Sequence, residues 1–172
     1  MKYEAAASFI RPEFPLSVVD WARLVTVDFE TYYDVDYTLS KLSTSEYIRD
    51  PRFKAQMVGI KIGSKPTKWY PAAKVKTALQ VINWNTHSLL CHNTQFDGFI
   101  MSHHYGIVPH KYYDTLSMAR LQLGNHLSVG LEALARHYGL ASKTVPYDRM
   151  RGRRWADMDP GLRAELATGC LH

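Results

Sequence analysis

Cysteine is scarce in this chain, with two in 172 residues. So few cysteines, both in apolar surroundings, exclude a disulfide framework and a cysteine-rich zinc site, and they indicate a reducing compartment. Long apolar runs are missing as well. No stretch approaches the roughly 18 apolar residues that a membrane-spanning helix needs, and the first residues lack the apolar segment of a signal peptide. We therefore expect a cytoplasmic protein without a membrane partner.

Negative charge is in the minority. The chain has 21 Lys and Arg against 16 Asp and Glu, a formal charge of +5 and a pI near 9.2. This balance favours a polyanionic partner over an acidic small molecule. Apolar residues make up 46% of the chain and aromatic residues 12%. A chain of this length and composition suits one domain that buries roughly 70% of its unfolded surface.

The expected organisation is an arm followed by a single domain. Residues 1–20 contain Pro12 and Pro15 and show no sustained hydrophobic period, so we predict an arm outside the core. Residues 21–172 then form the domain.

Hydrophobic periodicity predicts an α/β fold for this domain. The expected order is three strands, a helix, a strand, a helix, a strand and further helices. Antiparallel first strands followed by strand–helix crossovers give a mixed central sheet of about five strands flanked by helices. The elements are expected at residues 24–31, 55–62, 67–70, 74–83, 88–92, 93–101, 113–120, 131–140 and 159–172.

Two acidic residues stand at the end of the first expected strand, which reads Leu-Val-Thr-Val-Asp-Phe-Glu-Thr over residues 24–31. Because side chains alternate along a strand, Asp28 and Glu30 point to the same side, roughly 6 to 7 Å apart. Such a pair can serve a two-metal centre for phosphodiester hydrolysis. Taken alone, the pair is more typical of a solvated strand end or a helix N-cap.

A third acidic residue follows a later strand. Residues 88–92 (Ser-Leu-Leu-Cys-His) predict a short buried strand, and the next residues predict a helix with Asn93 as its N-cap. Asp97 then lies in the first helical turn, where the helix dipole keeps a carboxylate ionised, as a metal ligand must be. The simpler alternative is that Asp97 only complements that dipole.

Together, Asp-Phe-Glu-Thr at residues 28–31 and His-Asn-Thr-Gln-Phe-Asp at residues 92–97 resemble the first two motifs of the DnaQ-like (DEDD) 3′–5′ exonucleases. The likeness continues at residues 113–120 and 131–140, in the expected order. It implies a ribonuclease H-like fold.

Within this superfamily, the chain most resembles the proofreading domain of bacteriophage family A DNA polymerases. The segments that carry this closer resemblance are Asp-Phe-Glu-Thr-Tyr-Tyr at residues 28–33 and Glu-Tyr-Ile-Arg-Asp-Pro-Arg-Phe at residues 46–53. For a viral protein, the expected location becomes the cytoplasm of the host cell.

The resemblance implies hydrolysis of the terminal phosphodiester at a nucleic-acid 3′ end, with release of a nucleoside monophosphate. Asp28, Glu30 and Asp97 are then the catalytic residues and the ligands of two divalent metal ions. Mg²⁺ is the expected ion, and Mn²⁺ is able to replace it at oxygen ligands.

Four residues are expected to contact the terminal nucleotide. They are Phe29, through its backbone, and Thr31 on one side of the cleft, and Asn93 and Phe96 across from them. For two of them a structural role is the alternative, because Asn93 can serve only as an N-cap and Phe96 can belong to the core.

The superfamily requires a fourth acidic ligand, from a third motif on a C-terminal helix. Residues 159–172 predict a helix with Asp159 as N-cap and with Leu162, Leu166 and Cys170 on its buried side. A residue after the last one given would fall on the same side, where the resemblance places the missing aspartate. We therefore expect a fragment of a longer polymerase-like protein. The alternative is that the terminal carboxylate of the chain replaces the ligand.

Other positions also depart from the pattern of the superfamily or support its ligands. Gly169 stands where many relatives carry a tyrosine that orients water, and Thr168 stands at the place of a histidine, although threonine accepts no proton near neutral pH. Asp114 and His92 are assigned supporting roles beside the ligands, and Asp114 is not counted as the fourth ligand.

Basic residues crowd the segment before the last helix. Arg149, Arg151, Arg153 and Arg154 are expected to follow the phosphates of the incoming strand. The alternative is a solvated loop.

The main hypothesis is a proofreading exonuclease that acts on single-stranded DNA 3′ ends, with a polymerase domain or subunit as partner. One alternative is a catalytically silent DNA-binding or polymerase-docking module with an exonuclease fold. A second alternative is an RNA-trimming 3′–5′ exoribonuclease, because the same carboxylates cleave either nucleic acid.

Overall fold

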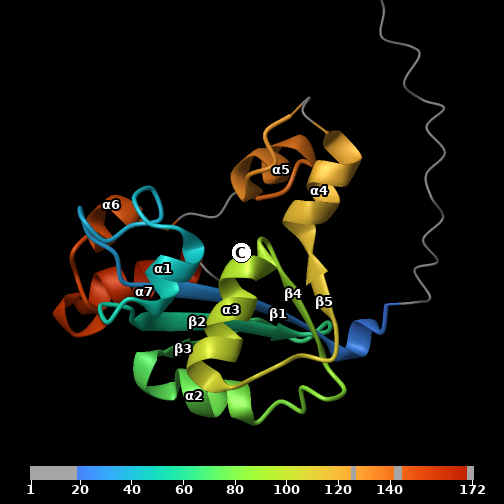
Figure 1. Cartoon of the computed structure of the whole chain (residues 1–172), viewed down its shortest axis with the longest axis horizontal. Helices are drawn as coiled ribbons and strands as arrows, with labels where there is room; N and C mark the ends of the chain where they lie inside the picture. Colours follow the sequence, from blue (N-terminus) through green and yellow to red (C-terminus); the bar gives the residue numbers. More distant parts are fainter. Residues whose placement is uncertain (1–18, 125–126, 142–144, 170–172) are drawn as a thin grey trace, which may run out of the picture.

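An open five-stranded sheet in the order β3-β2-β1-β4-β5 forms the centre of the protein (Figure 1). The computed structural model describes residues 19–124, 127–141 and 145–169, so most of the expected arm lies outside the described residues. The strands are β1 (Leu24–Thr31), β2 (Ala55–Ile62), β3 (Lys68–Pro71), β4 (Ser88–Cys91) and β5 (Tyr112–Asp114). The helices are α1 (Thr44–Arg49), α2 (Ala72–Gln80), α3 (Thr94–Tyr105), α4 (Thr115–Leu123), α5 (Leu131–His137), α6 (Tyr147–Met150) and α7 (Pro160–Gly169), with 3-10 turns η2 (Trp21–Arg23) and η3 (Trp155–Asp157).

The predicted elements occur in the predicted order, and where they differ from the prediction they differ at their ends. Helix α2 stops at Gln80, earlier than predicted, yet Ile82 beyond its end is still buried. Helix α3 continues to Tyr105 and ends at Gly106, whose left-handed φ of 66° suits a residue without a Cβ. Periodicity identifies the buried positions but does not fix the residue at which a helix ends.

The sheet is mixed. Strand β1 pairs antiparallel with β2 and parallel with β4, and β4 pairs parallel with β5. The carboxyl ends of β1, β4 and β5 therefore meet at one edge, which is where ligand sites of open α/β sheets form. Helices α3 and α4 begin at this edge, directly after β4 and β5.

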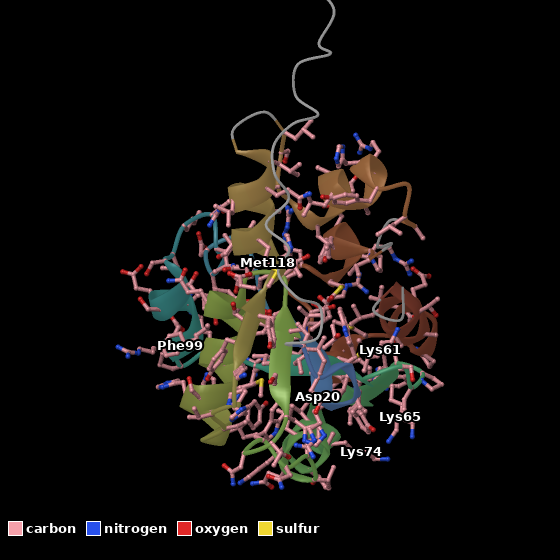
Figure 2. All side chains as sticks on the ribbon, turned by 90° about the vertical axis from the view of Figure 1, so that its right-hand side faces the viewer. Asp20, Lys61, Lys65, Lys74, Phe99 and Met118 are labelled. Atoms are coloured by element: carbon pink, nitrogen blue, oxygen red, sulfur yellow. The ribbon has the colours of Figure 1, made fainter. Side chains whose placement is uncertain are left out.

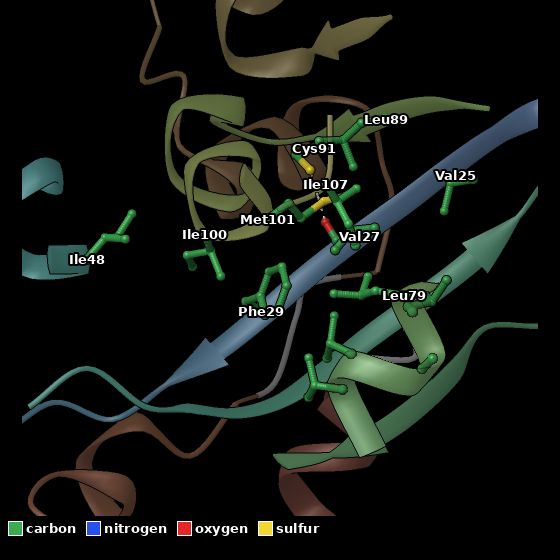
Figure 3. Packing of buried hydrophobic residues seen from close by; sticks show 14 of the residues in the cluster. Val25, Val27, Phe29, Ile48, Leu79, Leu89, Cys91, Ile100, Met101 and Ile107 are labelled. Carbon is green, nitrogen blue, oxygen red and sulfur yellow. Dashed lines mark hydrogen bonds between the residues drawn. The ribbon is translucent and has the colours of Figure 1, made fainter. Parts of the chain in front are cut away.

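The main core lies on one face of the sheet. Figure 3 shows Val25, Val27 and Phe29 of β1 beside Leu79 of α2 and Ile100 and Met101 of α3. All six side chains are buried. This face of β1 thus follows the alternation predicted from the sequence.

The opposite face of β1 is covered by α7. Met57 of β2 lies directly opposite Glu30, and paired residues of an antiparallel ladder share a face. Met57 belongs to the same buried cluster as Leu162 and Leu166 of α7. Helix α7 therefore covers the same sheet face to which Glu30 belongs.

Helix α3 approaches the sheet edge closely at Gly98. A Cβ placed there would lie 3.2 Å from a ring carbon of Tyr112 on β5.

None of the helices in the described ranges has the length and apolar character needed to cross a membrane.

Candidate active site

One hydrogen bond joins the two segments that carry the predicted ligands. The backbone amide of Phe29 donates to Oδ1 of Asp97 at 3.0 Å, although the two residues are 68 positions apart. Phe29 is the residue between Asp28 and Glu30, so the Asp97 carboxylate lies against the strand segment that carries both. Glu30 and Asp97 are each only 5% exposed, and Asp28 is half-buried.

The turn between β4 and α3 sets the position of Asp97. Asn93 adopts a left-handed conformation with φ 76°, which asparagine tolerates better than most residues. Its backbone amide donates to Oδ1 of Asp114 at 2.8 Å. Asn93 occupies the N-cap position, but its side chain makes no capping bond, so the predicted capping role is wrong. The side-chain amide of Asn93 therefore does not cap α3.

Asp114 holds two strand–helix junctions together. Its carboxylate accepts hydrogen bonds from the amide of Asn93, from the amide of Leu116 at 3.1 Å and from the hydroxyl of Ser117 at 2.8 Å. Burial tends to raise the pKa of this carboxyl, but the hydrogen bonds outweigh burial and lower it below its usual value. This geometry matches the supporting role assigned from the sequence, which stays a prediction.

His92 joins the same junction. Its Nδ1 lies 3.0 Å from the hydroxyl oxygen of Thr115, the first residue of α4. Burial lowers the pKa of His92, and a hydrogen bond with the backbone of Val129 only partly opposes this. The ring is therefore mainly neutral near pH 7.

Negative charge surrounds the end of β4. The Cys91 thiol donates to the carbonyl of Val27 at 3.3 Å (Figure 3). Burial raises the pKa of this thiol well above its usual value, and the charges of Asp97, Asp28 and Asp114 raise it further. Carboxylates from β1, α3 and the end of β5 thus act on one buried atom, which indicates an electronegative site.

The donors suit a hard divalent cation, but they do not form a complete cage. Carboxylate oxygens are the ligands that Mg²⁺ and Mn²⁺ prefer. Among the residues that the structure describes, no group of three or more His, Cys, Asp or Glu side chains is arranged to hold one ion. The chemistry of Asp28, Glu30 and Asp97 fits a metal, whereas their arrangement supplies only part of a coordination sphere.

A tyrosine network that the sequence did not reveal supports the end of β1. The hydroxyl groups of Tyr47 and Thr31 lie 2.8 Å apart, and Tyr47 donates to the carbonyl of Tyr32 at 2.5 Å. Burial is the main cause that raises the pKa of Tyr47 to about 12. The Thr31 hydroxyl group thus has Tyr47 as a hydrogen-bond partner. A tyrosine on a short amphipathic helix carries no pattern that identifies this partner.

The two predicted aromatic contacts differ in what they leave exposed. The Phe29 ring is buried and stacks on Tyr105 with centroids 6.0 Å apart, so the backbone is the part of Phe29 that borders Asp97. Its contact with the terminal nucleotide stays a prediction. Phe96 is half-buried and lies 6.0 Å from the Tyr47 ring. Packing against the core is what the simpler interpretation of Phe96 expects.

The four arginines lie before α7 with exposed side chains. Arg149 pairs with Glu165 and Arg151 with Asp148, whereas the Arg154 guanidinium lies 5.5 Å from the Tyr32 ring centre. The amide of Gly152 donates to the carbonyl of Tyr33 at 2.8 Å. This bond brings the arginine segment to the chain that leaves β1.

Helix α7 begins as predicted. Oδ1 of Asp159 accepts from the amide of Leu162 at 2.8 Å. Gly169 is buried, whereas Thr168 is exposed and its hydroxyl donates to the carbonyl of Ala164. The predicted inward position of Cys170 and the terminal carboxylate lie outside the described residues.

Comparison with known families and with curated proteins gives no match, but solved structures do match. NrnC of Brucella melitensis superposes with a TM-score of 0.59 at 16% identity, covering 87% of this chain and 68% of that chain. A structure of NrnC with bound Mg²⁺ gives 0.60 at 15% identity, with 87% and 67% covered.

RNase D from two organisms also matches. The Trypanosoma brucei enzyme in complex with RNA U12 gives a TM-score of 0.59 at 14% identity, covering 87% of this chain and 52% of that chain. Escherichia coli RNase D, an exoribonuclease involved in structured RNA processing, gives 0.55 at 14% identity, with 86% and 36% covered. At these identities the matches establish the fold. The chain has the ribonuclease H-like fold predicted from its sequence.

Proposed function

We propose that this chain is the nuclease domain of a metal-dependent 3′–5′ exonuclease. The observation that carries the proposal is the hydrogen bond from the Phe29 amide to Asp97, which brings the second acidic motif against the first. Asp28, Glu30 and Asp97 would hold the divalent ions. When bound, such ions supply Lewis-acid stabilisation of charge on phosphate oxygens and a more acidic water.

RNA is the favoured substrate of the proposed enzyme. The similar structures include one bound to RNA U12 and one named as an exoribonuclease. The excess of Lys and Arg suits either nucleic acid. Proofreading of DNA with a polymerase partner, which the phage-like segments favour, is the second candidate. Cytoplasmic location stays a prediction.

The chain's own residues would prepare the substrate in two ways. The Tyr47–Thr31 pair fixes the backbone where β1 ends, and Asp114 fixes the turn that presents Asn93. The terminal nucleotide would lie between these two supports. Neither Gly169 nor Thr168 offers a proton acceptor, so water must be oriented by groups other than the usual tyrosine or histidine.

A release assay tests the proposal. RNA and DNA oligonucleotides of the same sequence, labelled at the 3′ end, are incubated with Mg²⁺, with Mn²⁺ or with EDTA. We expect metal-dependent release of labelled nucleoside monophosphate, faster from RNA, that Asp28→Ala abolishes. Binding without release would support the silent-module alternative, and faster loss from DNA would support proofreading.

A further inference from the structure

A β-bulge in β2 lies beside Glu30. Glu30 pairs with Met57, but the next residue of β1, Thr31, pairs with Ala55, so Gln56 is an extra residue in β2. An extra residue bends the strand and redirects its side chain. The bulge thus removes Gln56 from the regular alternation of β2.

The Gln56 side chain is used to hold the arginine segment. It is only 2% exposed, and its Nε2 donates to the carbonyl of Arg153 at 2.9 Å. Beside it, the amide of Gly152 donates to the carbonyl of Tyr33. A buried amide with a hydrogen bond fixes its partner firmly, because losing that bond would leave a polar group unpaired in the interior.

The side chains of the held segment remain exposed. Arg151, Arg153 and Arg154 all project from the loop between α6 and η3. Arg151 has a surface ion pair with Asp148 at 3.6 Å and Arg154 a contact with the Tyr32 ring. Exposed ion pairs of this kind are weak, so phosphate groups can compete for these guanidinium groups.

We propose that Gln56 is a positioning residue that fixes the Arg151–Arg154 loop as a subsite for the phosphates upstream of the 3′-terminal nucleotide. The inference rests on the proposed function and deepens it. Gln56 does not touch the reacting atoms. It therefore governs the binding of long strands rather than the cleavage of a dinucleotide, which has no upstream phosphates to reach the loop.

The experiment measures binding and cleavage separately. Fluorescence anisotropy in EDTA gives Kd for a 12-nucleotide RNA at several KCl concentrations, and turnover in Mg²⁺ gives kcat/KM for the same RNA and for a dinucleotide. Gln56→Met has similar size but no donor. We expect it to weaken 12-mer binding about tenfold and to lower the salt slope by about 0.7 for each phosphate that the loop no longer neutralises. Dinucleotide kcat/KM should stay within about twofold of the wild-type value.

Matched controls identify the cause. Gln80→Met makes the same exchange at an exposed position of α2 and should change nothing. Arg153→Ala should weaken binding, whereas Lys65→Ala, which removes the same charge, should not. Figure 2 shows Lys61, Lys65 and Lys74 together, well below Met118 of α4. Lys65 follows the far end of β2, about 20 Å along the strands from Glu30.

Gly152→Ala provides a second route if Gln56→Met fails to fold. Gly152 has φ 71° and no neighbour within 4 Å of its missing Cβ, so alanine strains the loop backbone without disturbing the core. We expect the same decrease in salt slope. Wild-type affinity and slope in the folded Gln56→Met or Gly152→Ala variant would overturn the inference while the exonuclease stands. A wild-type chain that neither binds nor cleaves would overturn both.

Discussion

The buried carboxylate of Asp97 accepts a hydrogen bond from the Phe29 amide and carries a negative charge, and these two properties can be tested separately. Asp97→Asn keeps an oxygen for the Phe29 amide but removes the charge that a cation requires. We expect exonuclease activity to fall at least about 100-fold, with a urea midpoint no lower than that of the wild type. Asp36→Asn, at an exposed site, is the control. Equal activity in both variants would exclude Asp97 from the catalytic set.

Cys91 illustrates the opposite case, a reactive group made inert by its surroundings. Its burial and the nearby negative charges raise the thiol pKa, and the protonated thiol is a poor nucleophile. In a Cys170→Ser background, we expect no reaction with a disulfide reagent at pH 8 until urea unfolds the chain. Rapid labelling of the native protein would show that the end of β4 is open to solvent.

At the scale of elements, the Tyr47 hydroxyl group helps to hold the chain where β1 ends. Tyr47→Phe removes the bonds to Thr31 and Tyr32 and leaves the Tyr32 carbonyl without this donor. We expect a decrease of about 1–3 kcal/mol in the free energy of unfolding, measured by urea denaturation. Tyr138→Phe, at an exposed ring, should have a much smaller effect. A similar decrease in both variants would mean that the Tyr47 hydrogen bonds contribute no more to stability than an exposed tyrosine hydroxyl does.

The elements themselves could be predicted from sequence because their residues repeat with the period of the structure. The alternation of β1 separates Val25, Val27 and Phe29 from Asp28 and Glu30, and each set reaches the face or edge expected. The turn at Asn93 could not be predicted in the same way. Its left-handed backbone is accompanied by a hydrogen bond to Asp114, 21 residues later, and local propensity contains no information about such a partner.

Some residues of the candidate site could be predicted from local sequence, whereas others depend on pairing between distant segments. Asp28, Glu30 and Asp97 are recognisable because they form short motifs with fixed spacing. Gln56 is not, since only strand register shows that it is the extra residue of a bulge, and register follows from pairing across the whole sheet. The arginines were identifiable by composition, but their support from β2 was not.

At the scale of the whole molecule, stability should depend on pH through two histidines, the half-buried His92 and the more exposed His104. His104 contacts the carbonyl of Ile48 at 2.8 Å and stacks on Phe53. Burial is the main cause that lowers the pKa of both His92 and His104 in the folded state. The unfolded chain therefore binds protons first as pH falls below about 6.5, and the folded state loses stability.

Urea denaturation at pH 7.5 and 5.5 measures this effect. We expect a higher midpoint at pH 7.5, where the unfolded histidines are also neutral and the full contribution is present. The double variant His92→Gln/His104→Gln should reduce the difference between the two pH values. An unchanged difference would assign the pH dependence to other groups.

The close approach of α3 to the sheet edge has a consequence for sequence evolution. Because no methyl group at Gly98 separates the helix from the Tyr112 ring, the layer spacing at this point is set by a pair of positions. Alanine at position 98 would push the ring or the helix by a few tenths of an ångström, and the neighbouring Asp97 would move with the helix. Homologous chains should therefore change positions 98 and 112 together, and that covariation would record how closely α3 approaches the sheet beside Asp97.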